Sequence, residues 1–242
     1  MNMFCADMHV HTIASPDARI YPRELVSTLR KKGFSIVVVT DHDTIKGWKE
    51  VSYYSRKNGM IFVRGVELSF RGAHILLYGI GKTGWKRILS LRETGSLEEL
   101  RDLIKKENGI MAAAHPLLRP KGIGAIGFDR SIFDAVEVFN GGARNFREAL
   151  RLARGIPGIG GSDAHFREFI GRCWTCFDEM PGSEDDVLEY IRQGKITAGG
   201  IPSTTGDMIR RYFYFVVRTP LTRYPLLVKK GIKRIARMLG GR

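Results

Sequence analysis

Residues 4–11 read Phe-Cys-Ala-Asp-Met-His-Val-His, a short apolar run that leads into two histidines. Side chains two residues apart on a β-strand face the same side, so His9 and His11 point to one spot. Barrels and open sheets present their ligand-binding side chains at strand ends in this way. The segment therefore predicts a first strand with a metal site at its carboxyl end.

Apolar runs of strand length alternate with amphipathic stretches of helix length along the chain, which indicates βα units around a mainly parallel sheet. The expected strands cover residues 4–8, 35–40, 61–66, 74–80, 110–114, 135–139, 158–161 and 173–177. The expected helices cover residues 22–32, 44–57, 97–107, 146–154 and 183–193. A length of 242 residues fits one α/β barrel as well as it fits two small domains.

The composition is that of a globular protein, with 43% hydrophobic and 26% charged residues. It excludes collagen-like, low-complexity and disordered chains. No apolar run approaches the roughly 20 residues that a membrane-spanning helix needs. Asp7 and His9 interrupt the stretch where a signal peptide would be continuously apolar. These features favour a cytoplasmic location.

Three cysteines, an odd number, argue against a disulfide framework. Cys173 and Cys176 form a Cys-x-x-Cys motif that could be a redox pair or half of a zinc site. No second such motif exists to complete a zinc site. The favoured interpretation is therefore that these are small residues within a strand.

All six histidines lie in short motifs of metal-ligand type, and all except His74 end or follow an apolar run. Asp163 and His165, two residues apart, repeat the geometry of the first pair. The motifs are Asp7-Met8-His9-Val10-His11, Thr40-Asp41-His42-Asp43, His74, Ala114-His115-Pro116 and Gly161-Ser162-Asp163-Ala164-His165. Mixed imidazole and carboxylate ligands suit Zn, Mn or Fe, whereas Mg takes oxygen ligands almost alone.

Glu67 ends the expected strand 61–66. A carboxylate has two oxygens and can bridge two ions, which a histidine cannot. A site with more than one metal needs at least one such residue, so Glu67 is the candidate bridge.

These motifs resemble the polymerase and histidinol phosphatase (PHP) superfamily of metal-dependent phosphoesterases. The matching pieces run in the family's order from residue 7 to residue 165. They are Asp7-x-His9-x-His11-Thr12, Ser15-Pro16-Asp17, Thr40-Asp41-His42-Asp43, Gly65-x-Glu67, His74-Ile75-Leu76, Ala114-His115-Pro116 and Gly161-Ser162-Asp163-Ala164-His165. The resemblance implies a distorted (β/α)7 TIM-like barrel with two or three divalent metals at the carboxyl ends of its strands.

The resemblance also implies a division of the ligands among the metals. His9, His11, Glu67 and Asp163 would hold the first metal; Glu67, His74 and His115 the second; and Asp17, His42 and His165 the third. His74 starts its apolar run, so it reaches this end of a barrel only if its strand runs antiparallel. We expect that antiparallel strand.

The implied reaction is hydrolysis of a phosphomonoester or phosphodiester by a metal-bound hydroxide held near Glu67 and Asp163. His165, or water on the third metal, would help the leaving oxygen depart. The substrate would be a small phosphate ester, a nucleotide or an oligonucleotide end. Asp7, Asp41 and Asp43 are expected to orient ligands, and Arg119 and Arg172 to contact phosphate.

Basic residues are concentrated after residue 206. Residues 207–242 contain ten Lys or Arg and one acidic residue, a net charge of +9 out of the chain's +14. The stripe Val228, Ile232, Ile235 and Leu239 has helical spacing, and its other faces are basic. We expect residues 1–206 to form the barrel and this extension to dock on it through the stripe. The alternative is contact with RNA, DNA or an anionic membrane surface.

Two other functions fit parts of the pattern. Amidohydrolases are also barrels with His-x-His and a late Asp, but they usually need a bridging Lys, where this chain has Glu67. A non-catalytic barrel could bind nucleic acid through the basic extension. Such relatives tend to lose ligands, and this chain retains the full set.

Overall fold

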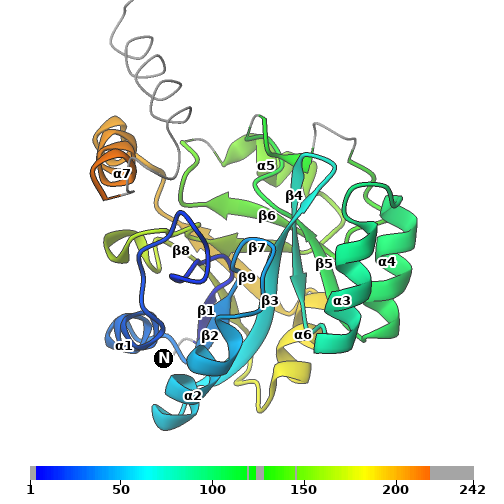
Figure 1. Ribbon diagram of the computed structural model, residues 1–242, viewed down its shortest axis with the longest axis horizontal. Coiled ribbons are helices and arrows are strands. Elements are labelled where there is room, and N and C mark those ends of the chain that lie inside the picture. Colours follow the sequence, from blue (N-terminus) through cyan, green and yellow to red (C-terminus); the bar gives the residue numbers. More distant parts are fainter. Residues whose placement is uncertain (1–3, 119, 124–127, 145, 219–242) are drawn as a thin grey trace, which may run out of the picture. The chain divides into compact units, whose positions relative to one another are not determined.

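The computed structural model describes residues 4–118, 120–123, 128–144 and 146–218 (Figure 1). The chain divides into two compact units, Met1–Pro202 and Ser203–Arg242. In the second unit the structure describes helix α7 (Thr205–Arg218), whereas the apolar stripe from Val228 to Leu239 lies outside the described residues. Among the helices described, none combines the length and the apolar character needed to cross a membrane.

Nine strands form one sheet in the first unit, in the order β7-β6-β5-β4-β3-β2-β1-β8-β9. β4 is antiparallel to both of its neighbours, and β8 and β9 are antiparallel to theirs, while the remaining pairs are parallel. The strands are β1 (Phe4–Asp7), β2 (Ile36–Val39), β3 (Ile61–Phe70), β4 (Ala73–Tyr78), β5 (Ile110–Ala113), β6 (Ala135–Asn140), β7 (Gly158–Gly161), β8 (Cys173–Phe177) and β9 (Ile196–Gly200).

The sheet closes on itself just beyond the end of β1. Met8 N–H donates to Gly160 O at 3.2 Å, Asp163 N–H to His9 O at 2.7 Å, and His11 N–H to Ala164 O at 3.0 Å. β1 to β7 thus form a nearly closed ring, and the antiparallel pair β8 and β9 extends the sheet from the first residues of β1. The expected (β/α)7 barrel is confirmed.

Helices surround this ring (Figure 1), and most turn one apolar face toward it. Leu25, Val26 and Leu29 of α1 are buried, as are Val187, Leu188 and Ile191 of α6. The helices are α1 (Pro22–Lys31), α2 (Trp48–Lys57), α3 (Lys82–Leu91), α4 (Leu97–Lys106), α5 (Arg147–Leu152) and α6 (Glu184–Arg192), with a short 3-10 helix, η2 (Arg167–Phe169). A capping box between Ser96 and Glu99 starts α4, and Ser183 caps α6, because a side-chain oxygen can accept an otherwise unpaired first-turn N–H.

The barrel interior is filled by apolar side chains from the strands, most of them small or β-branched. They pack around Tyr78, which is fully buried and whose hydroxyl donates to Met8 O at 2.8 Å. This packed interior supports the carboxyl ends of the strands from below. The main members are Ala6, Met8, Ile36, Val38, Val63, Leu76, Ile110, Ala112, Ala135 and Ile159.

The strands and helices expected between residues 4 and 193 are present, with their ends shifted by a few residues. Helices α3 and α7, the short helix η2 and strand β9 were not expected. α3 starts at Gly81 without a side-chain cap, and β9 ends in two glycines, so both lack the usual start or strand signals. β3 continues to Phe70, four residues beyond the expected end, because β4 pairs with residues 65–70. Glu67 therefore lies inside the strand rather than at its end.

The direction of β4 decides whether His74 lies at the same end of the barrel as the other candidate ligands. Its neighbours run the other way, with Ser69 opposite His74 in β3 and Ala113 opposite Ile75 in β5. The start of β4 therefore lies beside the ends of β3 and β5. The expectation of an antiparallel strand is confirmed.

The expectation that the cysteines form no disulfide is wrong. Cys5 and Cys176 are bonded, with Cα atoms 4.0 Å apart, because antiparallel β1 and β8 place them directly opposite each other. Sequence spacing did not reveal this register. Cys173 is buried and takes no part in this disulfide. As expected, the Cys-x-x-Cys motif lies within a strand, β8.

Gly161 marks a close approach of β7 to His9, just after β1, and to Glu137 in β6. A Cβ atom there would lie 2.2 Å from His9 Cβ and 2.9 Å from Glu137 Oε1. We expect Gly161→Ala to lower the free energy of unfolding by about 1–3 kcal/mol, as overpacking does, measured by denaturant unfolding. Gly182→Ala is the control, since its Cβ would meet only the terminal oxygen of Asp186, at 3.2 Å. Equal stability of the two variants would contradict the close approach.

Candidate metal centre

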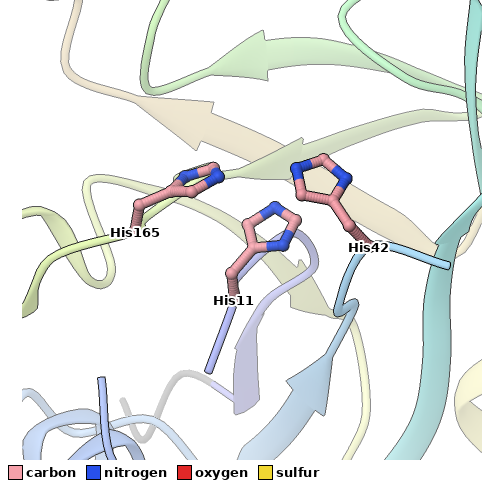
Figure 2. A group of neighbouring side chains, drawn as sticks. All are labelled: His11, His42 and His165. Atoms are coloured by element: carbon pink, nitrogen blue, oxygen red, sulfur yellow. The ribbon is translucent and has the colours of Figure 1, made fainter. Parts of the chain in front are cut away.

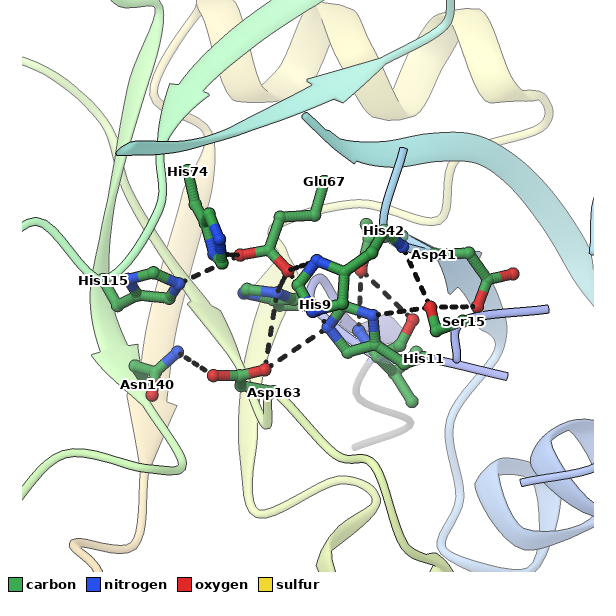
Figure 3. Close-up of polar contacts among 12 residues, drawn as sticks. His9, His11, Ser15, Asp41, His42, Glu67, His74, His115, Asn140 and Asp163 are labelled. Atoms are coloured by element: carbon green, nitrogen blue, oxygen red, sulfur yellow. Dashed lines mark hydrogen bonds and ion pairs between the residues drawn. The ribbon is translucent and has the colours of Figure 1, made fainter. Parts of the chain in front are cut away.

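Nine side chains converge at the end of the barrel where the parallel strands finish, and Figure 3 labels all of them except Asp17 and His165. Each lies within 3.6 Å of another member of the group, nitrogen to oxygen. They are His9 and His11 after β1, Asp17 in the loop before α1, His42 after β2, Glu67 in β3, His74 in β4, His115 after β5, and Asp163 and His165 after β7. The structure thus brings together all nine residues that the sequence suggested as metal ligands.

Glu67 is the centre of this group and is almost fully buried. Its Oε1 lies 2.6 Å from His74 Nδ1 and 3.0 Å from His115 Nε2. Its Oε2 lies among three other imidazoles: 3.1 Å from His9 Nε2, 3.3 Å from His11 Nε2 and 3.0 Å from His42 Nδ1. Each carboxylate oxygen therefore faces its own set of histidines, which is the arrangement of a bridging ligand.

Two aspartates complete the two sides of the group. Asp163 Oδ1 lies 3.3 Å from His11 Nε2 and 3.6 Å from His9 Nε2. Asp17 Oδ2 lies 3.3 Å from His165 Nε2 and 3.6 Å from His42 Nε2. Asp163 thus joins the buried side, and Asp17 the outer side.

Three sets of these residues place one ligand atom each within 4.8 Å of one another. The sets are His9, His11, Glu67 and Asp163; His42, Glu67 and His74; and His11, His42 and His165. The last set is drawn in Figure 2, where its three rings face a common space. Two of these sets differ from the division of ligands that the family resemblance implies. His42 lies with Glu67 and His74, and His11 lies with His42 and His165.

Several buried ligand atoms of the group lack a hydrogen-bond partner among the described residues. His9 Nε2, His11 Nε2 and Glu67 Oε2 are of this kind, and they belong to one set. Buried polar atoms are almost always paired, so such a cluster indicates a missing partner. The imidazole and carboxylate set fits a Zn, Mn or Fe ion.

Second contacts fix the orientation of three of the rings. The Nδ1 of His9 lies 3.0 Å from Glu137 Oε1, that of His11 lies 3.3 Å from Ser15 Oγ, and that of His165 lies 3.1 Å from the Asp163 carbonyl oxygen. When Nδ1–H donates to such an acceptor, Nε2 keeps its lone pair for a metal. The three Nε2 atoms all face the group.

The charges within the group reinforce one another. Burial lowers the pKa of His11, but its close contacts with the carboxylates of Asp163 and Glu67 outweigh this and raise the pKa to about 9. Burial alone would raise the pKa of Glu67, yet His9 and His42 hold it well below its usual range. The pKa of Asp163 is held low in the same way. The carboxylates therefore stay ionised and present negative charge to a cation.

Asp7 and Asp41 support the ligands from behind. Asp7 accepts hydrogen bonds from Ser162 N–H at 2.7 Å and Gly171 N–H at 2.8 Å, and burial raises the pKa of Asp7 to about 6. Asp41 accepts from Ser15 Oγ–H at 3.0 Å, and Ser15 Oγ in turn accepts from His42 N–H at 2.9 Å. Asp7 thus joins β1 to the loops beside β7 and β8, and Asp41 positions Ser15.

Asp43 is turned away from His42. Its Oδ1 accepts from Ser69 N–H at 2.8 Å, and its Oδ2 lies 3.4 Å from Arg92 Nη1. Its backbone has φ +49°, and Asp163 and His115 also have positive φ, at +50° and +25°. Such conformations are costly for residues other than glycine and cluster at functional sites.

The two arginines expected at the phosphate differ in what the structure describes. Arg172 precedes β8, where its carbonyl oxygen accepts from Ile201 N–H at 2.9 Å. The pKa of Lys32 is lowered mainly by burial of its ammonium group, and the positive charge of Arg172 lowers it further. Arg119 lies outside the described residues. A phosphate contact by either residue stays a prediction.

Three residues beside the ligands were not foreseen: Ser15, Glu137 and Asn140. Asn140 Nδ2 lies 3.5 Å from Asp163 Oδ2, and Glu137 contacts His9 and the backbone of His115. A glutamate flanked by valines in an apolar strand is a signal, since ionised side chains are rarely buried without a partner. Ser15 carries no such signal, because serine is common in loops.

Comparison with known proteins gives the family. A model described as PHP domain matches residues 7–119, and one described as PHP-associated matches residues 143–196. An uncharacterized protein of Methanocaldococcus jannaschii is 32% identical over 146 residues, which cover 56% of this chain and 81% of that protein. A 5'-3' exoribonuclease of Haemophilus influenzae is 34% identical over 99 residues, or 39% of this chain and 36% of that enzyme. This chain thus spans about a third of the exoribonuclease's length.

Solved structures show the same fold. A two-domain protein of Bacteroides vulgatus, containing a predicted PHP-like metal-dependent phosphoesterase, has a TM-score of 0.66 at 16% identity. The match covers 87% of this chain and 69% of that one. A lesion-specific endonuclease of Pyrococcus furiosus has a TM-score of 0.66 at 17% identity, covering 82% and 59%. With the ordered ligand motifs and the two matching models, the conclusion is that the chain belongs to the PHP family of metal-dependent phosphoesterases.

Proposed function

We propose that this protein hydrolyses a phosphomonoester or phosphodiester with the help of two or three divalent metal ions. The observation that carries the proposal is the position of Glu67 between two sets of imidazoles, with its Oε2 and the Nε2 atoms of His9 and His11 buried and unpartnered among the described residues. Divalent metals there would supply an activated water near neutral pH and neutralise charge that develops on the phosphate.

The residues divide into three holding groups in this proposal. His9, His11 and Asp163 would share Glu67 Oε2, while His74 and His115 would share Glu67 Oε1. Asp17, His42 and His165 form the third group. One carboxylate thus joins the first two groups and fixes their spacing.

Exposure indicates where a substrate would enter. The His9 side chain is fully buried, whereas those of His165 and Asp17 are 21% and 29% exposed. An ester therefore meets the third group first, with its phosphate directed inward. In this proposal His165 would supply a proton to the leaving oxygen.

The substrate class we favour is a nucleotide or an oligonucleotide end. The exoribonuclease and the lesion-specific endonuclease named above act on nucleic acids by their names, although both are longer than the matched part. The +9 extension of residues 207–242 adds a polycationic segment to the chain, which can strengthen such binding. Docking of this extension on the barrel stays our expectation for its main role.

Two other candidate functions remain as outcomes of the tests. An amidohydrolase would use the same kind of ligand set on amides or lactones. A non-catalytic barrel would bind metal or nucleic acid without turnover. The amidohydrolase function would be excluded if the protein hydrolysed phosphate esters but no amide or lactone. The non-catalytic function would be excluded by any metal-dependent turnover.

We expect the purified protein to carry at least two transition-metal ions and Glu67→Gln to lose most of them, because an amide has one acceptor oxygen where the carboxylate has two. Elemental analysis after dialysis measures this loss. Hydrolysis should fall with the metal, by about tenfold or more. Glu184→Gln, which alters a carboxylate bonded to Arg64, is the control and should keep its metal. Full metal content in Glu67→Gln would contradict the bridging role.

A screen with Mn, Zn and Fe supplied separately tests the reaction itself. We expect hydrolysis of p-nitrophenyl phosphate, bis-p-nitrophenyl phosphate or a 5'-phosphorylated oligonucleotide, and none of an amide or lactone. Chelation should abolish the activity, and metal should restore it. Full activity in metal-free protein would end the proposal, and turnover of amides alone would favour the amidohydrolase.

Arg172→Ala should lower kcat/KM for the phosphate ester by about 10- to 100-fold, the value of one or two charge-assisted hydrogen bonds. Its metal content should stay the same, because no metal-ligand role is proposed for it. Steady-state kinetics and elemental analysis give the two values. Equal losses of metal and activity would instead make Arg172 a structural residue.

A further inference from the structure

Glu137 lies in the middle of β6, between β5 and β7, and is 1% exposed. Its neighbours Val136 and Val138 are buried apolar residues. Within the described ranges, its carboxylate is paired with no lysine or arginine. Burial of an unpaired carboxylate is expensive, so its two contacts with the metal centre must account for its presence.

Each oxygen of Glu137 has a different partner. Oε1 accepts from His9 Nδ1–H at 3.0 Å, and Oε2 accepts from the backbone N–H of His115 at 2.7 Å. The first contact fixes the tautomer of His9, so that Nε2 faces Glu67 Oε2 and Asp163. The second holds the peptide of a residue whose φ is +25°.

These partners lie on opposite sides of the bridge. His9 faces Glu67 Oε2, and His115 Nε2 faces Glu67 Oε1 at 3.0 Å. Glu137 therefore contacts the same two residues as Glu67, His9 and His115, but not through their Nε2 atoms. The rings of these two histidines are stacked with centroids 5.7 Å apart.

We propose that Glu137 is a positioning residue that couples the two buried halves of the metal centre through His9 Nδ1 and the His115 amide. The proposal rests on the proposed metal-dependent function. It adds that neither half keeps its geometry when this carboxylate is lost. Strand β6 thus contributes to the site without supplying a ligand.

Glu137→Gln is the direct test, because glutamine keeps the shape but offers only one acceptor oxygen. Asp134→Asn is the matched control. Asp134 precedes β6 at the other end of the barrel, where it also accepts a backbone N–H from β5, that of Met111 at 2.9 Å, and pairs with Arg101. Both variants therefore remove one carboxylate that joins β5 to β6.

We expect the zinc affinity of Glu137→Gln to fall about 10- to 100-fold, as the loss of such outer contacts does, and that of Asp134→Asn to change less than twofold. Calorimetric titration of the chelated protein with Zn²⁺ measures both. In zinc-saturated wild type, the Nδ1 proton of His9 should give a downfield, slowly exchanging NMR signal. Glu137→Gln should lose this signal, and Asp134→Asn should keep it.

The outcomes separate the two proposals. A wild type that binds no zinc would overturn the metal centre and this inference together. A wild type that binds zinc, with Glu137→Gln equal to it or with the His9 signal intact, would overturn this inference alone. If Glu137→Gln does not fold, Glu137→Asp replaces it. Its carboxylate is too short to reach both partners, so it should also lose at least tenfold in affinity, and wild-type affinity would overturn the inference.

Discussion

The carboxylate of Glu67, buried among five imidazoles, is the contact on which the site depends. An ionised carboxylate inside a barrel loses its hydration, and only nearby positive charge or a bound cation offsets that loss. These five imidazoles come from four strands: two follow β1, and the others lie after β2, at the start of β4 and after β5. The barrel therefore serves as a frame that holds this one charge in place.

Two features of the sheet make that frame possible. β3 extends past the end of β2, so that Glu67 stands at the height of the residues that follow the other strands. The reversed direction of β4 then brings in His74 from the start of a strand. A barrel with all strands parallel would place that histidine at the opposite end.

The candidate ligands could be picked out from the sequence, because the histidines and the acidic residues near them lie in short motifs that run in the family's order. The antiparallel β4 could also be predicted, since only that direction makes His74 useful. The register of β1 against β8, and hence the Cys5–Cys176 bond, could not, because pairing between distant strands leaves no local signal. Glu137 and Ser15 act through other residues, and their contacts depend on side-chain directions that spacing does not fix. Arg172 follows the last motif, which ends at His165. Nothing in the sequence decides which way its side chain points.

The β3–β4 hairpin has a consequence for how the protein reaches its native state. Glu67 and His74 are neighbours within one hairpin, so their contact forms with little loss of chain entropy. The contacts of β1 with the loop after β7, such as Asp7 with Ser162, join residues 155 positions apart. Contacts of that kind form late and slowly in folding. The part of the centre around Glu67 and His74 thus forms locally, whereas the part around β1 and the loop after β7 is complete only when the ring of strands closes. A cation bound by both parts would therefore stabilise the closed barrel relative to every open intermediate.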